Sequence, residues 1–210
     1  MACLFLMQDT LDCAIYVDTG YSYPETQAMI ALAETYLPVH RVQVDRDANH
    51  RLEGIPADVV PVEWTPAGQS MTTPKPYRIQ PSFQCCYDNL AKPLMAKAKA
   101  LGATHLVMGL RADEAMKATS RDGDVVEGMI RLHPIESWTA PQVLAYLATH
   151  MEVPAHFALT HSSLDCYDCP AFHRTSQDRI AWTKDRYPGY YAAYAQKQNA
   201  ILAAVEASLR

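Results

Sequence analysis

The chain has 210 residues, of which 49% are hydrophobic and 20% are charged. These proportions are those of an ordinary globular protein and exclude a chain that is disordered throughout. The net charge of −5 disfavours a protein that binds nucleic acid through a broadly basic surface, but it still permits a small basic pocket for a phosphorylated ligand. The sequence has no run of about 20 apolar residues, which a membrane-spanning helix needs, so a membrane is not expected as a partner.

The start of the chain and its cysteines bear on the cellular compartment. Met1–Met7 is apolar, but it lacks a basic flank and is soon followed by Asp9 and Asp12, a pattern unlike that of a signal peptide. Six cysteines without an export signal favour a reducing compartment, where thiols bind metals or react and seldom form disulfides. We therefore expect the protein to be cytoplasmic.

Predicted helices and strands alternate through residues 1–44. The apolar start, residues 1–8, is compatible with a strand or the end of a helix, and its apolar spacing suits the buried side of a helix. Ala14–Val17 is a compact apolar run that predicts a buried strand leading into a turn at Asp18-Thr19-Gly20. Glu25–Tyr36 has helical periodicity, and Val39–Val44 predicts a second strand.

Residues 45–81 differ from the rest of the chain because prolines recur through them. Proline restricts the backbone and removes a hydrogen-bond donor, so we expect a long irregular segment with short pieces of regular structure. Segments of this length are usually functional lids or disordered, and the sequence leaves both interpretations open.

The second half of the chain resumes the alternation of helices and strands. Gly102 is expected to end one helix, and Thr139 followed by Pro141 is a typical helix start. The predicted helices are residues 87–101, 140–150 and 190–209, and the predicted strands are residues 104–108 and 130–135. This alternation predicts an α/β fold in which a mostly parallel sheet is flanked by helices.

Four of the cysteines form two closely spaced pairs. Cys85 and Cys86 are adjacent, and Cys166 and Cys169 form a C-x-x-C pair. Thiolates are soft ligands that suit an iron–sulfur cluster or zinc, and four of them complete a ligand set. Adjacent cysteines strain a tetrahedron around one metal ion, which favours a cluster. Zinc and four scattered reduced cysteines remain as alternatives.

A resemblance to a known family begins with this cysteine pattern. A Cys-Cys pair followed, after residues 87–165, by C-x-x-C resembles the four-iron, four-sulfur site of bacterial-type adenylylsulfate reductases. The resemblance implies a [4Fe-4S] cluster ligated by Cys85, Cys86, Cys166 and Cys169. Zinc is the alternative metal.

Further motifs resemble the phosphoadenosine-phosphosulfate reductase family of the PP-loop superfamily. Asp18-Thr19-Gly20 with Tyr23-Pro24-Glu25-Thr26 is similar to its "DTG…FPET" stretch, and Met108–Glu114 is similar to its "TGLRREQ" loop. Arg131–Thr139 and His161–Cys166 resemble, in the same order, its "NPL-x-x-W-[ST]" segment and the serine-rich lead into its C-x-x-C. The resemblance implies an adenine nucleotide alpha hydrolase-like, Rossmann-like fold with a nucleotide site at Asp18, Thr19, Gly20, Glu25, Gly109 and Arg111.

These nucleotide-binding residues make physical sense at the ends of predicted strands. Ligands of open parallel sheets bind beyond the carboxyl ends of the strands. Gly20 and Gly109 would let the backbone approach a ligand closely, and Arg111 would offer a bidentate fork to phosphate or sulfate. The alternatives are a capping turn at Asp18-Thr19 and an ordinary surface arginine at Arg111.

Two features of the family do not occur in this sequence. Its phosphate-binding loop, Ser-Gly-Gly-x-Asp-Ser, is absent, and Met1–Leu6 resembles the helix that follows that loop. We therefore expect an N-terminally truncated fold that lacks the first strand and the loop. The family's reductases attack sulfur with a cysteine near the C-terminus, and Ala200–Arg210 contains none, so no catalytic residue is assigned.

The resemblance implies an adenine-nucleotide-binding iron–sulfur oxidoreductase of sulfur metabolism that acts on a sulfonucleotide in sulfate reduction. ATP or a sulfonucleotide would be its ligand, and a thiol electron donor or sulfur carrier its partner. One alternative is an ATP-dependent sulfur-transfer enzyme, for which alone nucleic acid would be a partner, and another is a degenerate cluster-binding module. We expect residues 1–189 to form the nucleotide-binding domain with the cysteine site, followed by a C-terminal helix at residues 190–210.

Overall fold

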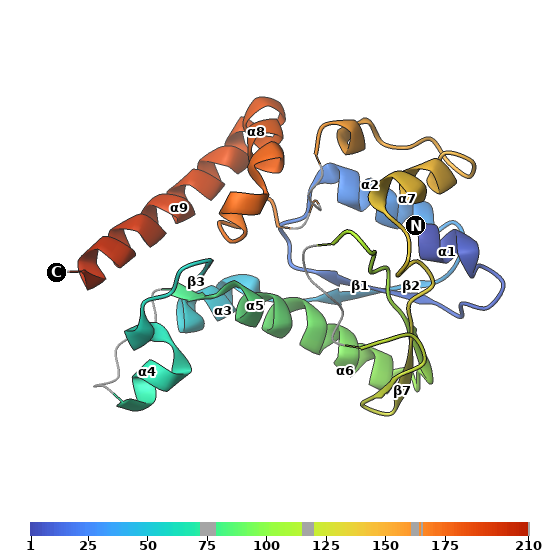
Figure 1. The fold of residues 1–210 in the computed structure, drawn as a ribbon, viewed down its shortest axis with the longest axis horizontal. Coiled ribbons are helices and arrows are strands. Elements are labelled where there is room, and N and C mark those ends of the chain that lie inside the picture. Colours follow the sequence, from blue (N-terminus) through green and yellow to red (C-terminus); the bar gives the residue numbers. More distant parts are fainter. Residues whose placement is uncertain (72–78, 115–119, 161–163, 165, 210) are drawn as a thin grey trace. The chain divides into compact units, whose positions relative to one another are not determined.

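The structure is a computed structural model that describes residues 1–71, 79–114, 120–160, 164 and 166–209 (Figure 1). Its α-helices are α1 (Ala2–Leu6), α2 (Pro24–Ala33), α3 (Arg46–Glu53), α4 (Pro66–Met71), α5 (Ser82–Cys86), α6 (Lys92–Ala100), α7 (Ala140–Leu147), α8 (Gln177–Arg186) and α9 (Pro188–Ser208). Its strands are β1 (Ala14–Asp18), β2 (Val39–Gln43), β3 (Ile55–Ala57), β4 (Ile79–Pro81), β5 (His105–Val107), β6 (Val125–Val126) and β7 (Met129–Leu132). Shorter turns of helix are η1 (Val62–Trp64), η2 (Tyr87–Ala91), η3 (Ala155–Ala158) and η4 (His173–Thr175).

The chain divides into two compact units, each assembled from separate stretches of sequence. Unit 1 comprises Met1–Tyr16, Ala28–His40 and Met95–Ala155. Unit 2 comprises Val17–Gln27, Arg41–Leu94 and His156–Arg210. The predicted C-terminal helix is present in unit 2 as α9, whereas the predicted domain boundary at residue 189 stays a prediction.

The described strands pair in small, mainly parallel sheets. β3 pairs with β4 in parallel, with Ile55 opposite Ile79, and β5 pairs with β7 in parallel, with His105 opposite Ile130. β6 adds to β7 in the antiparallel direction, and β1 pairs with β2. The predicted α/β class with parallel strands and flanking helices is therefore confirmed. No helix among the described residues is both long and apolar enough to cross a membrane.

The core of unit 1 forms around the short helix α1. Ala2 packs in a cluster with Ile135 and Leu147, and Leu4 packs with Ala33 and Leu37. The apolar start of the chain is thus the helix that its spacing favoured, with apolar side chains buried against two neighbouring parts of the unit. Burial of this kind is the main driving force for a helix too short to be stable alone.

The predicted start of helix α7 is confirmed. Thr139 precedes the helix in an extended conformation, and its backbone N–H donates to the Gln142 side-chain oxygen at 2.8 Å. Pro141 lies in the first turn, where its missing N–H would have no partner within the helix in any case.

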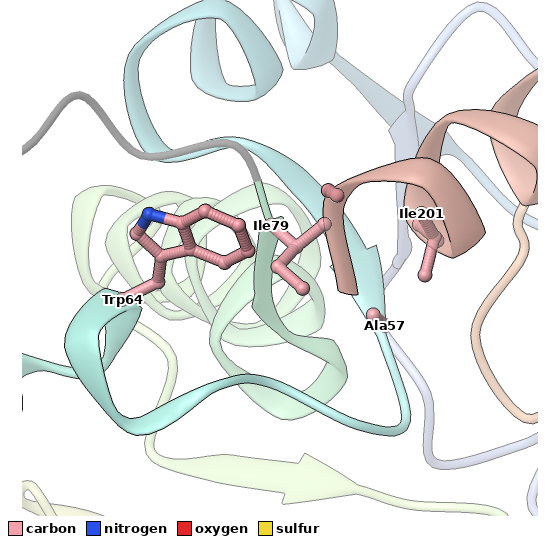
Figure 2. Close-up of a cluster of buried hydrophobic side chains, with 5 residues drawn as sticks. Ala57, Trp64, Ile79 and Ile201 are labelled. Carbon is pink, nitrogen blue, oxygen red and sulfur yellow. The ribbon is translucent and has the colours of Figure 1, made fainter. Parts of the chain in front are cut away.

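The core of unit 2 forms where the β3–β4 sheet meets helix α9. Ile79 of β4 is 1% exposed and packs with Ala57 of β3, Trp64 of η1, and Ile201 and Ala204 of α9 (Figure 2). The sheet is short, and its apolar side chains gain most of their burial from the helix that covers them. The last helix of the chain is therefore part of the same core as the strands.

The described part of residues 45–81 contains several short helices and strands. Asp45 accepts a hydrogen bond from the Ala48 backbone N–H at 2.8 Å and so caps helix α3, and β3, η1, α4 and β4 follow. The prolines that the structure describes in this segment fall at strand and helix positions that tolerate them, such as the first residue of α4. The described part of this segment thus contains the short pieces of regular structure that were expected, and two of them, β3 and β4, form a sheet of the core.

Helices α5 and α6 are joined through the π-helical turn η2 in one continuous helical run (Figure 1). Asn89, in the turn, is buried and donates to the Cys85 backbone oxygen at 2.9 Å. The run ends at Ala100, and Gly102 adopts a left-handed conformation with φ +70°, as expected of a glycine that ends a helix. Single π-turns inside helices occur often at functional sites, and this one directly follows Cys85 and Cys86.

The burial of Ile79 predicts a large loss of stability on truncation. Ile79→Ala should lower the free energy of unfolding by about 2–5 kcal/mol, because lost methyl groups leave a cavity in the core. Urea denaturation followed by tryptophan fluorescence measures this change. Val62→Ala is the matched control, since Val62 is 70% exposed, and its effect should stay within about 0.5 kcal/mol. Equal effects of the two substitutions would contradict this account of the core.

Candidate functional site

The two cysteine pairs line one cavity within unit 2. Cys85 and Cys86 come from helix α5, and Cys166 and Cys169 from the loop before η4, where the Cys169 N–H donates to the Cys166 oxygen at 3.1 Å. All four are free cysteines, with Cys85 buried and the other three partly buried. The cavity measures about 50 Å³, in which about three or four water molecules would fit. The four predicted metal ligands are therefore brought together.

Polar and charged side chains from five other parts of unit 2 line the same cavity. They come from the turn after β1, from α3, from the start of α5, from η2 and from α8. These residues are Thr19, Arg46, His50, Ser82, Asn89 and Arg179, and the cavity is completed by Pro56, Leu90 and Phe172. The thiols therefore face hydrogen-bond donors and buried positive charge.

Three of these side chains contact cysteine sulfur. Thr19 Oγ1 lies 3.4 Å from Cys166 Sγ, and His50 Nε2 lies 3.4 Å from Cys85 Sγ. Asn89 Nδ2 donates to Cys85 Sγ at 3.6 Å. Outer groups of this kind fix the orientation of ligand side chains and tune a bound metal.

Burial in the cavity opposes the formation of thiolates at Cys85 and Cys169. Burial raises the pKa of Cys85 to about 12, and the neighbouring Cys169 and Cys166 add to the effect. Burial also raises the pKa of Cys169 to about 12, with a further contribution from Cys166. Thiols of this kind are poor nucleophiles. They lose their protons only when a metal cation replaces the protons on the sulfur atoms.

The arrangement of the cysteines bears on the kind of group they could hold. Within the described ranges, no three histidine, cysteine, aspartate or glutamate side chains converge closely enough to bind one metal ion. The four thiols line one cavity, and four thiolates are a ligand set that proteins use both for zinc and for iron–sulfur clusters.

A buried ion pair anchors the C-x-x-C loop. Arg46, the first residue of α3, donates from Nη1 and Nη2 to the two carboxylate oxygens of Asp168 at 2.7 and 2.9 Å. Lys197 of α9 donates to the same carboxylate at 2.6 Å. Arg46 and Asp168 are each 2% exposed, so water screens this bidentate pair very little.

The charges of this network stabilise one another. Burial alone would raise the pKa of Asp168, but its hydrogen bonds and ion pairs with Arg46 and Lys197 lower it. Burial alone would lower the pKa of Arg46, but Asp168 and the neighbouring Cys166 raise it. The Asp168 carboxylate and the Arg46 guanidinium are therefore both charged in the folded protein.

Aromatic side chains hold the same loop from the other side. The Arg46 guanidinium carbon lies 3.5 Å from the centre of the Tyr21 ring, and the Tyr21 hydroxyl donates to Asp47. Tyr167, which is inside the C-x-x-C, stacks on Tyr190 of α9 with ring centres 3.8 Å apart. The loop is thus fixed both to α3 and to α9.

Four of the predicted nucleotide-binding residues lie in unit 2. Gly20 has φ +77° and donates its N–H to the Asp18 carboxylate at 2.8 Å, which forms a tight turn at the end of β1. Thr19, in this turn, points its hydroxyl at Cys166. Glu25 accepts a hydrogen bond from the Tyr187 hydroxyl at 2.8 Å. Asp18 and Thr19 thus take part in a turn that also contacts the cysteine site.

Gly109 and Arg111 lie in unit 1, so they are described apart from the other four residues. Arg111 is paired with Asp113 at 3.1 Å and with Glu114 at 3.0 Å, and Asp113 also accepts the Ala140 N–H at 2.7 Å. The Arg111 side chain remains 27% exposed, so a stronger anion can reach it. His161–Ser163 and Asp165, from the predicted lead into the C-x-x-C, lie outside the described residues.

Several site residues were not predicted from the sequence. Arg46, His50 and Lys197 stand in no motif, and each contacts a residue far away in the chain. Asp168 could have been noticed, because a carboxylate inside a C-x-x-C pair must be compensated if the pair is buried. Nothing local indicates that Arg46 compensates it, since 122 residues separate the two.

A comparison with protein families finds one match over most of the chain. The family model described as the phosphoadenosine phosphosulfate reductase domain matches residues 1–172. This range includes all four cysteines of the cavity and every predicted nucleotide-binding residue. A comparison with curated proteins finds no match.

The buried ion pair predicts a strong dependence of stability on Asp168. Asp168→Asn should lower the free energy of unfolding at pH 7 by about 3 kcal/mol or more, because Arg46 would keep a buried charge without its full partner. Urea denaturation measures the loss. Asp185→Asn, at an exposed position of α8, is the control and should change stability by less than about 0.5 kcal/mol. A small effect at Asp168 would mean that the pair is solvated.

Proposed function

The chain belongs to the phosphoadenosine phosphosulfate reductase family, and from this membership we propose that it binds an iron–sulfur cluster and acts on a sulfonucleotide. Cys85, Cys86, Cys166 and Cys169 would hold the cluster, which we take to be of the [4Fe-4S] type. Adenylylsulfate or phosphoadenylylsulfate would be the substrate class, and a thiol protein or small thiol would return the electrons that sulfate reduction consumes.

The observation that carries the cluster assignment is the convergence of two distant cysteine pairs on one cavity. Residues 87–165 separate the pairs in the sequence, yet all four thiols line the same space of about 50 Å³. Cysteines that share no ligand have no physical reason to converge on one cavity. Four thiolates are the usual ligands of [4Fe-4S] clusters.

The surroundings of the thiols support the same assignment. Thr19 and Asn89 can donate hydrogen bonds to the sulfur atoms of Cys166 and Cys85, and Arg46 adds a positive charge. Hydrogen bonds to sulfur, local charge and exclusion of water are the means by which proteins adjust iron–sulfur clusters. A scattered set of core cysteines would need none of these polar neighbours.

Different residues of this chain would bind the cluster and the nucleotide. When bound, the cluster would supply one-electron chemistry or a fixed charge beside the substrate. The Asp18-Thr19-Gly20 turn would hold the nucleotide close to Cys166, since Thr19 contacts that cysteine. In unit 1, the Arg111 guanidinium is kept in position by Asp113 and Glu114 and would exchange a carboxylate for phosphate or sulfate.

The cluster proposal predicts the metal content of the protein. Protein purified without oxygen should contain about four iron atoms and four acid-labile sulfides per chain. Its visible spectrum should show a broad absorption band in the blue region. Cys166→Ser should lose most of this iron and sulfide. Cys13→Ser is the control, because Cys13 is not among the residues that line the cavity, and it should keep both. Zinc without sulfide in the wild-type protein would overturn the cluster assignment.

The nucleotide proposal predicts a selective role for Arg111. Arg111→Ala should weaken the binding of adenylylsulfate or phosphoadenylylsulfate at least about tenfold, because a charge-assisted hydrogen bond contributes about 1.5–3 kcal/mol. Isothermal titration calorimetry measures the Kd.

The control for Arg111 is Arg121→Ala, an exposed arginine of the same unit, which should bind like the wild type. Binding of ATP with release of pyrophosphate, and no binding of sulfonucleotides, would favour a sulfur-transfer enzyme instead. A folded, cluster-loaded protein that binds no nucleotide at all would indicate a module without catalysis.

A further inference from the structure

We propose, on the basis of the proposed function, that Arg46 is the charged hydrogen-bond donor that raises the reduction potential of the cluster from its Cys166 side. Arg46 would act as a positioning and tuning residue, since it is not one of the cysteine ligands. Three features of Arg46 support this role. Its Nε–H has no hydrogen-bond partner among the described residues, its guanidinium is held in one position, and the buried charge around the guanidinium is positive in sum.

The guanidinium of Arg46 has donors to spare at the cavity. Nη1 and Nη2 are taken by Asp168, whereas Nε is buried and meets no hydrogen-bond partner among the residues that the structure describes. Arg46 also lines the cavity, together with Cys166. An arginine N–H can only donate, and a buried donor without a partner destabilises the folded protein. A sulfur atom of the cluster would satisfy it.

The position of Arg46 is determined from several sides. The Asp168 carboxylate binds it through two parallel hydrogen bonds, and the Tyr21 ring covers the guanidinium at 3.5 Å. Asp47 adds an ion pair at 3.7 Å. The side chain is only 2% exposed, so neighbouring atoms prevent the guanidinium from rotating into solvent. The charge is therefore present beside the thiols before any cluster binds, as preorganisation requires.

The buried charges nearest to the C-x-x-C are unbalanced. Arg46 and Lys197 share the buried carboxylate of Asp168, whereas the second carboxylate beside Arg46 belongs to Asp47, whose side chain is 47% exposed and is therefore screened by water. The buried part of the network thus carries an excess of positive charge. A cluster of iron, sulfide and four thiolates is anionic, and it becomes more negative when an external donor such as dithionite adds one electron. Attraction to the excess positive charge is therefore stronger in the reduced state, which makes the reduction potential less negative.

Two other donors that contact the cysteine sulfur atoms, Thr19 and Asn89, are neutral side chains and add hydrogen bonds without adding charge. Arg179 lines the cavity as well, so the experiment must separate the two arginines.

The test compares two arginines of the same helix. Arg46→Gln removes the charge and leaves Asp168 paired with Lys197, whereas Arg51→Gln removes an arginine whose side chain is 69% exposed. Each anaerobically purified protein is titrated with dithionite and followed by visible absorption and electron paramagnetic resonance, with iron and sulfide measured in parallel. The midpoint potential should become more negative in Arg46→Gln and stay at the wild-type value in Arg51→Gln. An unchanged potential in a fully loaded Arg46→Gln protein would overturn the inference.

A second measurement decides the matter if Arg46→Gln fails to fold or to hold a cluster. Wild-type protein labelled with [¹⁵N]arginine is reduced and examined by pulsed electron paramagnetic resonance. A weak ¹⁵N coupling to the cluster should appear, and it should remain in Arg179→Lys and vanish in Arg46→Lys. No coupling in the loaded wild type, or a coupling that follows Arg179, contradicts the role of Arg46. If the wild type holds no cluster, the proposed function itself fails, and this result is recognised from its iron and sulfide content alone.

Discussion

The ion pair between Arg46 and Asp168 is the interaction on which the arrangement of unit 2 depends. Each partner is 2% exposed, and a buried charge without a partner would cost several kcal/mol. The pair therefore requires that the first turn of α3 and the C-x-x-C loop lie against each other, and Lys197 requires the same of α9. Once these three segments are in place, Cys166 and Cys169 have a defined position. The Tyr21 ring covers the Arg46 guanidinium, and the stacked rings of Tyr167 and Tyr190 add apolar contacts beside the ion pair. These rings keep water away from the pair.

The opposite wall of the cavity is determined by the β3–β4 sheet. Helix α5 begins directly after β4, so Cys85 and Cys86 are held about one turn of helix beyond the carboxyl end of a strand that is anchored by Ile79. Open parallel sheets commonly bind ligands at this edge. The C-terminal helix α9 takes part in both walls, because Ile201 and Ala204 pack on the sheet while Lys197 and Tyr190 contact the C-x-x-C loop. Packing in the core and geometry at the thiols are therefore properties of the same few elements.

The turn after β1 connects the two chemical features that the family membership brings together. Asp18 and Gly20 close a tight turn at the end of a strand, which is a common position for a nucleotide-binding loop, and Thr19 between them contacts Cys166. A ligand held at this turn would therefore lie close to the cysteine cavity. Such proximity would let a metal group influence a bound sulfonucleotide through charge alone, because electrostatic effects are strong where water is excluded.

The sequence by itself determined the α/β class, the family, most of the helices and strands, and the two cysteine pairs. These features are local: helical periodicity, the cap at Thr139, the glycine that ends α6 and the C-x-x-C spacing are all encoded within a few neighbouring residues. Only the tertiary structure decided that residues 46–57 form a helix and a strand of the core, and that Arg46, His50, Asn89 and Lys197 surround the cysteines. Sequence patterns predict them poorly because the partners of these residues are distant in the chain. A buried arginine and an exposed one, such as Arg46 and Arg51, look alike in a sequence, and they differ only in whether folding brings a carboxylate within reach.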